Sequence, residues 1–116
     1  MKRDTNLCLH HIYERTDRIL KIAQFVTYDE FRLNFILQDA VIRSFEVIGE
    51  AAHGIPRSYQ ARYPEIPFRQ FGQLRNFLIH EYFSVDLRRV WMIVQKDVPK
   101  FHEQVQNLLK IPQENT

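Results

Sequence analysis

Residues 67–83 read PFRQFGQLRNFLIHEYF, and this stretch carries both a helical pattern and a group of reactive side chains. Proline is favoured in the first turn of a helix, so Pro67 predicts a helix over residues 68–83. Successive helical residues turn by about 100°, which places three apolar side chains on one arc that faces a bundle. These are Phe71, Leu74 and Leu78.

The chemistry lies on another side of this predicted helix. Around the helix axis, Asn76 lies about 100° and His80 about 140° from Arg75, and Tyr82 lies about 20° the other way. Arginine offers a planar fork of donors to phosphate, and histidine moves protons near neutral pH. Gly72 lies about 60° from Arg75, where a missing side chain admits a close neighbour, either a ligand or a second copy of the helix.

The wide angle between Arg75 and His80 bears on how a site could be built. Two side chains about 140° apart on one helix do not easily meet the same phosphate. A two-fold dimer would bring two Arg/His sets together across one cleft. A composite site is therefore easier to build than a single-chain one.

After this stretch, Asp86 predicts the cap of a last helix that runs to about Lys110. Its apolar residues recur with helical spacing, and Pro99 within it predicts a kink. Residues 111–116 read as a frayed tail. The apolar stripe consists of Leu87, Val90, Trp91, Val94, Val98, Phe101, Val105, Leu108 and Leu109.

Before the stretch, two further long helices are predicted. The first runs from Asp4 to Val26, capped by Asp4 or Thr5, and the second from Thr27–Glu30 to about His53, ended by Gly54. Residues 56–63 predict one short helix, and residues 64–67 an extended link, because residues before proline avoid helical angles. The expected apolar positions are Leu7, Ile12, Ile19, Ile22, Ala23 and Val26 in the first helix, and Phe31, Phe35, Ile42, Phe45, Ile48 and Ala52 in the second.

Length and composition bound the fold class. The 116 residues form one domain, 1–116, and only 3 glycines and 5 prolines favour an all-α protein. The 9 Phe and 5 Tyr exceed what a lone thin bundle needs, which favours a packed dimer. Cys8 is the only cysteine, which excludes an internal disulfide and a thiolate zinc site. No apolar run approaches the length of a membrane span, so we expect a cytoplasmic protein without membrane contact.

Charge gives a weaker indication. The net charge is +2, but residues 51–100 carry eight Lys/Arg against four Asp/Glu, whereas residues 1–50 carry seven against eight. The positive excess surrounds the Arg75–Tyr82 stretch, which fits a phosphate-bearing partner about as well as a solvated basic surface.

Four other histidines have ordinary interpretations. His10 and His11 are adjacent, so they point about 100° apart and suit a shared metal ligand poorly. His53 and His102 have no partner within reach in the sequence, and Trp91 and Met92 read as core residues. Glu50 either reaches back to the Arg75–Tyr82 stretch or faces water.

Several segments together resemble one family. Residues 75–82 match an Arg-x4-His-x-Tyr signature, and the segments around it agree in order and spacing. The whole chain resembles the HepT-like branch of the HEPN superfamily, with Leu74 where relatives often carry methionine. The flanking segments are Ile48–Ala52, Tyr63–Pro67, Tyr82–Asp86 and Val90-Trp91.

The resemblance implies an all-α, HEPN-type up-down bundle of four long helices and one short one, forming a homodimer with the signature at its cleft. It implies a metal-independent endoribonuclease that needs no cofactor and acts as the toxin of a type VII-like toxin–antitoxin system. The implied partner is a minimal nucleotidyltransferase antitoxin that silences the toxin by transferring AMP from ATP to Tyr82.

Elementary chemistry agrees with these roles. Metal-independent RNA cleavage needs a base, an acid and positive charge at the phosphate, which His80 and Arg75 offer as catalytic residues. Asn76 and Glu50 are candidate supporting residues. Two other interpretations stay open: an exposed helix face with ordinary ion pairs, and a non-catalytic nucleotide-binding adaptor subunit for a nucleotidyltransferase.

Overall fold

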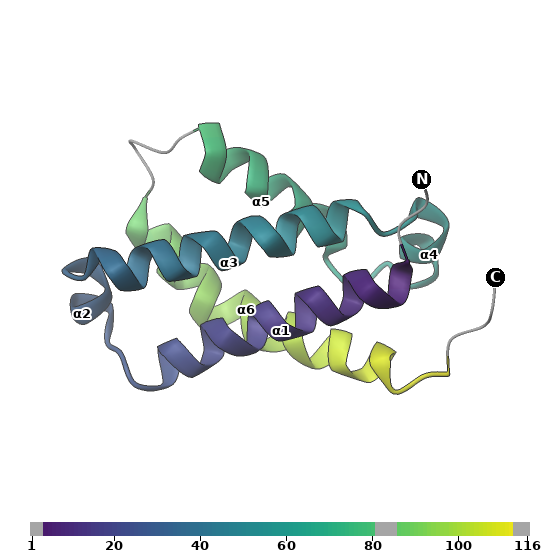
Figure 1. Cartoon of the computed structure of the whole chain (residues 1–116), viewed down its shortest axis with the longest axis horizontal. Coiled ribbons are helices and arrows are strands. Elements are labelled where there is room, and N and C mark those ends of the chain that lie inside the picture. The colour runs from purple at the N-terminus through teal and green to yellow at the C-terminus, as the bar shows by residue number, and fades with distance from the viewer. Residues whose placement is uncertain (1–3, 81–85, 113–116) are drawn as a thin grey trace.

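The structure, a computed structural model, describes residues 4–80 and 86–112, and for residues 75–80 it describes the backbone alone. This part of the chain is helical, and the prediction of an all-α protein is confirmed (Figure 1). Its helices are α1 Thr5–Gln24, α2 Tyr28–Arg32, α3 Phe35–His53, α4 Arg57–Arg62, α5 Phe68–His80 and α6 Leu87–Leu109.

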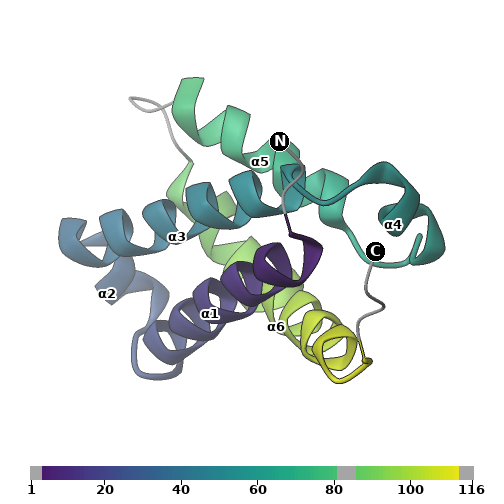
Figure 2. The ribbon, with the colours of Figure 1, turned by 45° about the vertical axis from the view of Figure 1, so that its right-hand side comes forward.

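The four longer helices form an up-down bundle in which α3 is central. One flank of α3 packs against α1 and another against α5, while α1 also packs along α6. Figures 1 and 2 show that the C-terminal end of α5 rises away from α3, whereas its N-terminal end lies close to it. No helix in the described ranges is long and apolar enough to cross a membrane.

Phenylalanine rings fill the core where α5 meets α6. The rings of Phe71 and Phe101 stack with centroids 4.2 Å apart, and Phe68 meets Phe101 edge-on at 5.8 Å. Tyr59 of α4 contacts Phe68 at 6.5 Å, so the short helix closes this end of the bundle. Burying such large rings supplies much of the driving force for folding.

Short polar side chains set the helix starts, as the sequence predicts. Asp4 accepts the N–H of Asn6, Asp86 accepts the N–H of Arg89, and Thr27 forms a capping box with Glu30. These caps satisfy backbone donors that have no partner inside the helix. At the other end of α3, Gly54 caps the helix in a right-handed conformation.

The predicted single helix from Thr27 to His53 is wrong, because the chain breaks between α2 and α3. The Asn34 side chain accepts the N–H groups of Ile36 and Leu37 at 3.0 and 3.2 Å and starts a new helix. The break resets the angular phase of the following residues. Phe31 before it is therefore fully buried, whereas Phe35 after it is 71% exposed and leaves the predicted apolar stripe.

Three smaller expectations also need correction. Leu7 and Met92 are 53% and 48% exposed, so neither is a core residue. Residues 64–66 form a turn rather than an extended link, because the Ile66 N–H donates a hydrogen bond to the Tyr63 carbonyl at 3.0 Å. The Ile66 side chain is buried at this turn.

The stripe of α6 is confirmed. Val90, Val94 and Val98 are buried, and the Trp91 ring packs 4.9 Å from that of Phe31. The helix continues through Pro99, and a kink there stays a prediction.

Candidate active site

The predicted catalytic residues lie on the C-terminal half of α5. The helix carries Arg75, Asn76 and His80, and its backbone is described as far as His80. Tyr82 lies outside the described residues. The orientation of this half therefore follows from the register of the first half, whose side chains are described.

Buried and exposed residues divide the first half of α5 into two arcs. Phe68 and Phe71 are buried, as is Gly72, whereas Arg69 and Gln73 are exposed. The exposed pair continues along the helix at intervals of three and four residues, to positions 76 and 80. Position 75 instead falls between the angular positions of Phe71 and Gly72. By helical register alone, positions 76 and 80 therefore fall on the same side of α5 as Arg69 and Gln73, and position 75 falls on the side of Phe71 and Gly72.

Gly72 shows what that arc meets. A Cβ atom at Gly72 would lie 3.8 Å from the Gly49 carbonyl oxygen and 3.8 Å from the His53 nitrogen, both on α3. The close neighbour of Gly72 is therefore a helix of the same chain, and the expectation of a ligand or second copy at this position is corrected. The small residues at 49 and 72 let the two backbones approach.

Helix α3 runs antiparallel to α5, so its earlier residues lie along the later residues of α5 (Figure 1). The rings of Phe45 and Phe71 stack at 6.4 Å, which aligns the two helices. Arg43, Glu46 and Glu50 follow one another at intervals of three and four residues, so they lie along one side of α3. We call this side the charged flank of α3. Arg43 and Glu50 are exposed, and the Glu46 side chain is 29% exposed.

This flank contains charges that the sequence analysis did not select. The Arg43 Nη1 atom lies 3.5 Å from Glu46 Oε2, a long ion pair on the α3 segment that includes Phe45, the ring that stacks on Phe71 of α5. Of the three residues, only Glu50 was predicted to support the site. The regular spacing of the three charges was the available signal, and it becomes informative only once α3 is known to lie along α5.

The opposite end of α5 has a different environment. The Arg62 guanidinium lies 5.0 Å above the Tyr59 ring and 6.0 Å above the Tyr63 ring. Burial raises the pKa of the Tyr59 hydroxyl above 10.0, the nearby Tyr63 raises it further, and Arg62 lowers it. At this end the Arg62 guanidinium and the aromatic rings pack on one another, so we interpret these residues as stabilising the fold and not as reactive groups.

The remaining histidines separate into exposed and packed ones. His10, His11 and His53 are exposed. His102 has a partner after all, because its ring stacks on Tyr13 of α1 at 4.7 Å and its Nε2 atom lies 3.5 Å from Asp17. Among the side chains that the structure describes, those of residues 4–74 and 86–112, no three His, Cys, Asp or Glu gather as a metal site.

A hollow of about 230 Å³ opens between α1 and α3 and is lined by His11, Glu14, Arg15 and Val47. Its lining residues belong to α1 and α3 and not to α5. Its residues do not include any of the predicted site residues. We therefore place the candidate site at the C-terminal half of α5 and the neighbouring flank of α3.

Known proteins resemble the chain over most of its length. A Methanocaldococcus jannaschii protein whose name joins a gamma-glutamylcyclotransferase to a provisional RNase is 40% identical over 95% of this chain, which spans about half of that protein. A second protein of that organism, provisionally named an RNase, is 37% identical over 90% of this chain and 96% of its own length. A probable ribonuclease HepT of Thermococcus cleftensis is 36% identical over 95% of this chain and all of its own length.

No solved structure matches the chain. The model of the ribonuclease HepT-like family matches residues 12–108, which include α5 and the flank of α3 beside it. The chain therefore belongs to the ribonuclease HepT-like family.

Proposed function

We propose that this protein is a metal-independent endoribonuclease whose catalytic residues are Arg75 and His80. The observation that carries the proposal is the intact Arg-x4-His-x-Tyr series in a chain of the ribonuclease HepT-like family. The fold supports it by holding the first half of α5 in the core and directing its second half away from α3.

In the proposed reaction, the 2′-hydroxyl oxygen of RNA attacks the adjacent phosphorus and the 5′-oxygen leaves. His80 moves the proton between these oxygens, and Arg75 stabilises the negative charge that develops on the phosphate. Asn76 precedes His80 by four residues, which places the two positions on the same side of α5, and Asn76 orients the His80 imidazole or the phosphate. Glu50 supports the site from α3.

The proposed biological role is that of a toxin in a type VII-like toxin–antitoxin system. A cognate nucleotidyltransferase antitoxin transfers AMP to Tyr82: the phenolic oxygen attacks the α-phosphorus of ATP, pyrophosphate leaves and the phenol loses its proton. An adenylate two residues from His80 would add bulk and negative charge where RNA must bind.

A cleavage assay tests the catalytic proposal. Purified protein is incubated with total RNA beside the His80→Ala and Arg75→Ala variants, and we expect each variant to be slower by about 10²–10⁴-fold. His10→Ala, which removes an exposed histidine from α1, is the matched control and should retain the wild-type rate. Equal cleavage by His80→Ala would remove His80 from the mechanism. No cleavage by any form, with nucleotide binding that survives His80→Ala, would favour the adaptor subunit.

Mixing the two inactive variants tests whether a site is shared between copies. If Arg75 of one chain acts with His80 of another, mixed dimers of Arg75→Ala and His80→Ala contain one intact site and recover activity. If both residues act within one chain, the mixture stays as inactive as its components.

Intact-mass measurement tests the modification. After co-expression with the nucleotidyltransferase, the mass should rise by one or more AMP units, and Tyr82→Phe should abolish the gain. Tyr28→Phe is the control and should keep it. A Tyr82→Phe protein that still gains AMP would overturn Tyr82 as the acceptor.

A further inference from the structure

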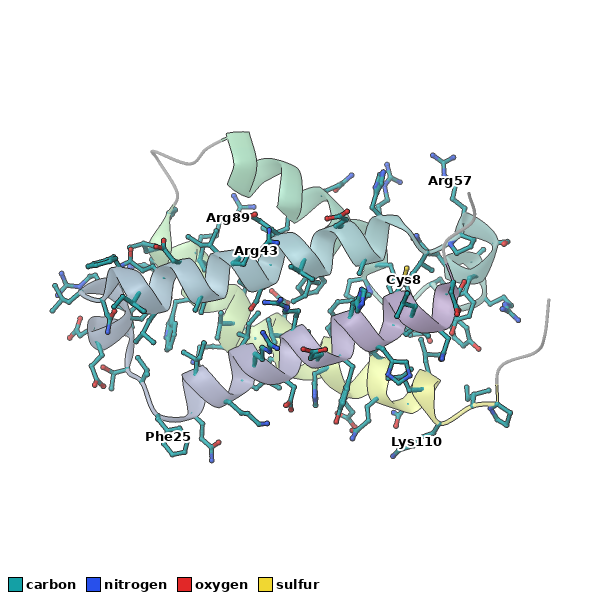
Figure 3. The ribbon with its side chains drawn as sticks, viewed as in Figure 1. Cys8, Phe25, Arg43, Arg57, Arg89 and Lys110 are labelled. Carbon is teal, nitrogen blue, oxygen red and sulfur yellow. The ribbon has the colours of Figure 1, made fainter. Side chains whose placement is uncertain are left out.

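Two arginines from different helices lie on the surface beside α5. Arg43 belongs to α3 and Arg89 to the first turn of α6, and both residues are exposed. Figure 3 shows the two labelled side chains close together in that view, at the edge of α3 that faces α5, whereas Arg57 lies at the α4 end. We call Arg43 and Arg89 the arginine pair.

Arg43 lies beside the second half of α5. Gly72 of α5 approaches Gly49 of α3, and the two helices are antiparallel, so residues after Gly72 run along residues before Gly49 (Figure 1). A helix rises by about 1.5 Å per residue, which places Arg43 about 9 Å along the axis from that contact. On the same scale Arg75 lies at about 4.5 Å and His80 at about 12 Å. Arg43 is therefore level with the proposed catalytic residues.

Arg89 approaches the same half of α5 from α6. Phe101 of α6 stacks on Phe71 of α5, and the end of α5 lies near the start of α6 (Figure 1). From this stack, Arg89 is about 18 Å back along α6 and His80 about 13.5 Å forward along α5. Lys100 follows Arg89 by eleven residues, or about three helical turns, so the two share one side of α6. Lys100 lines a small hollow at the start of α5, which shows that this side of α6 faces α5.

The position of Arg89 opposes the stability of α6. The first turn of this helix contains no acidic residue and carries both Arg88 and Arg89. Because the amide groups at a helix N-terminus already give a partial positive charge, cations placed there destabilise the helix. The Tyr28 ring, 4.9 Å from the Arg88 guanidinium, offsets part of this cost. Positive charge at a destabilising position beside a candidate site favours a role in binding an anion.

The Arg43 guanidinium is only lightly held by its own helix. Its ion pair with Glu46 uses one nitrogen, Nη1, at 3.5 Å, whereas the Arg18 guanidinium on α1 lies 2.7 Å from its carboxylate partner. The Arg43 side chain is 68% exposed, and arginine presents its N–H donors in a planar fork that matches a phosphate. Glu46 and Glu50 on the charged flank of α3 oppose attraction of an anion by net charge. Binding here therefore depends on directed hydrogen bonds from the guanidinium groups.

We infer that Arg43 and Arg89 bind the RNA phosphates that neighbour the scissile phosphate. The inference rests on the proposed function, since it takes RNA as the ligand and Arg75 and His80 as the centre of the site. A strand that reaches both arginines passes along the second half of α5. Contacts with phosphates fix the register of a nucleic acid without reading its bases, so the arginine pair positions RNA of any sequence.

Binding of a single-stranded RNA that carries 2′-O-methyl groups tests the inference, because this RNA lacks the attacking hydroxyl and stays intact. Arg43→Ala and Arg89→Ala should each raise the dissociation constant about 10-fold, as for a hydrogen bond to a charged group. Each should also reduce the slope of log affinity against log salt by about 0.7, the value for one phosphate contact on a single strand. Arg57→Ala removes an exposed arginine at the α4 end and should change neither quantity.

Lysine variants separate a phosphate contact from a structural role. Arg43→Lys and Arg89→Lys keep the charge but lose the planar fork, so they should restore the salt slope and only part of the affinity. If the lysine variants show the same reduced slope as the alanine variants, the pair does not contact phosphate and the inference is wrong. All variants must keep the helical circular dichroism and unfolding temperature of the wild-type chain.

The binding experiment does not depend on cleavage. Wild-type protein that binds the methylated RNA through the arginine pair but cleaves no RNA would remove the proposed function and leave the contact. Wild-type protein that cleaves RNA, with the same KM, affinity and salt slope in both alanine variants, would overturn the inference and leave the proposed function. Alanine variants that lose ATP binding but keep RNA affinity would also overturn it, because the phosphates would then be those of a nucleotide.

Discussion

The two ends of the bundle use large apolar side chains in opposite ways. At the α4 end, Phe68 packs against both Tyr59 and Phe101, and Phe68 and Phe101 are almost fully buried. At the α2 end, Phe25, Leu33 and Phe35 are each more than 70% exposed, and Phe25 points into solvent at the end of α1 (Figure 3). Aromatic richness therefore stabilises the monomer at one end, while at the other it is available for a partner.

The largest expected effect separates the two ends directly. Phe101→Ala should lower the free energy of unfolding by about 3–5 kcal/mol, because it empties the stack on Phe71. Phe25→Ala removes the same side chain from the exposed end and should change stability by less than about 0.5 kcal/mol. Urea unfolding of both variants measures the difference, and equal effects would break the comparison.

The next effect tests what holds the exposed end in shape. Asn34→Ala removes the side chain that caps α3 and should cost about 1 kcal/mol. Asn34→Asp keeps an acceptor at the cap and should retain most of that stability. If the two variants unfold alike in urea, the cap is not what separates α2 from α3.

A third pair of effects, of opposite sign, tests the close packing of α3 and α5. Gly72→Ala should raise the free energy of unfolding by up to about 1 kcal/mol, since alanine favours the helix and its methyl group meets α3 at ordinary contact distance. Gly72→Leu overfills the same space and should cost about 1–3 kcal/mol. Thermal unfolding of the pair shows whether the approach needs glycine or merely a small side chain.

The smallest effect is confined to alkaline solution. Because burial raises the pKa of Tyr59 in the folded chain, the unfolded chain loses this proton first as the pH rises. The contribution of Tyr59 to stability is therefore complete below pH 10.0 and is lost as the pH rises through the folded pKa. Tyr59→Phe should unfold with a weaker pH dependence above pH 10.0 than wild type, and Tyr28→Phe should behave as wild type.

Local features of the chain allowed most helices to be predicted. Asp4, Thr27 and Asp86 cap helices because each bonds to a backbone group two or three residues away. The valines of α6 keep a regular spacing through one uninterrupted helix. The break at Asn34 was missed because its apolar neighbours continue a helical pattern, and only the hydrogen bonds of Asn34 and Gln38 show that the helix starts again.

The candidate site shows the same difference between features that local sequence determines and features that tertiary packing determines. The sequence alone determined the Arg75–Tyr82 signature and the family, because these depend on residue types at fixed spacing along the chain. Tertiary structure decided what each helix face meets: Gly72 of α5 meets α3, His102 of α6 meets Tyr13, and Phe35 of α3 meets solvent. The physical reason is that spacing along a helix fixes which residues share a face, whereas the neighbour of that face is chosen by packing between segments far apart in the chain.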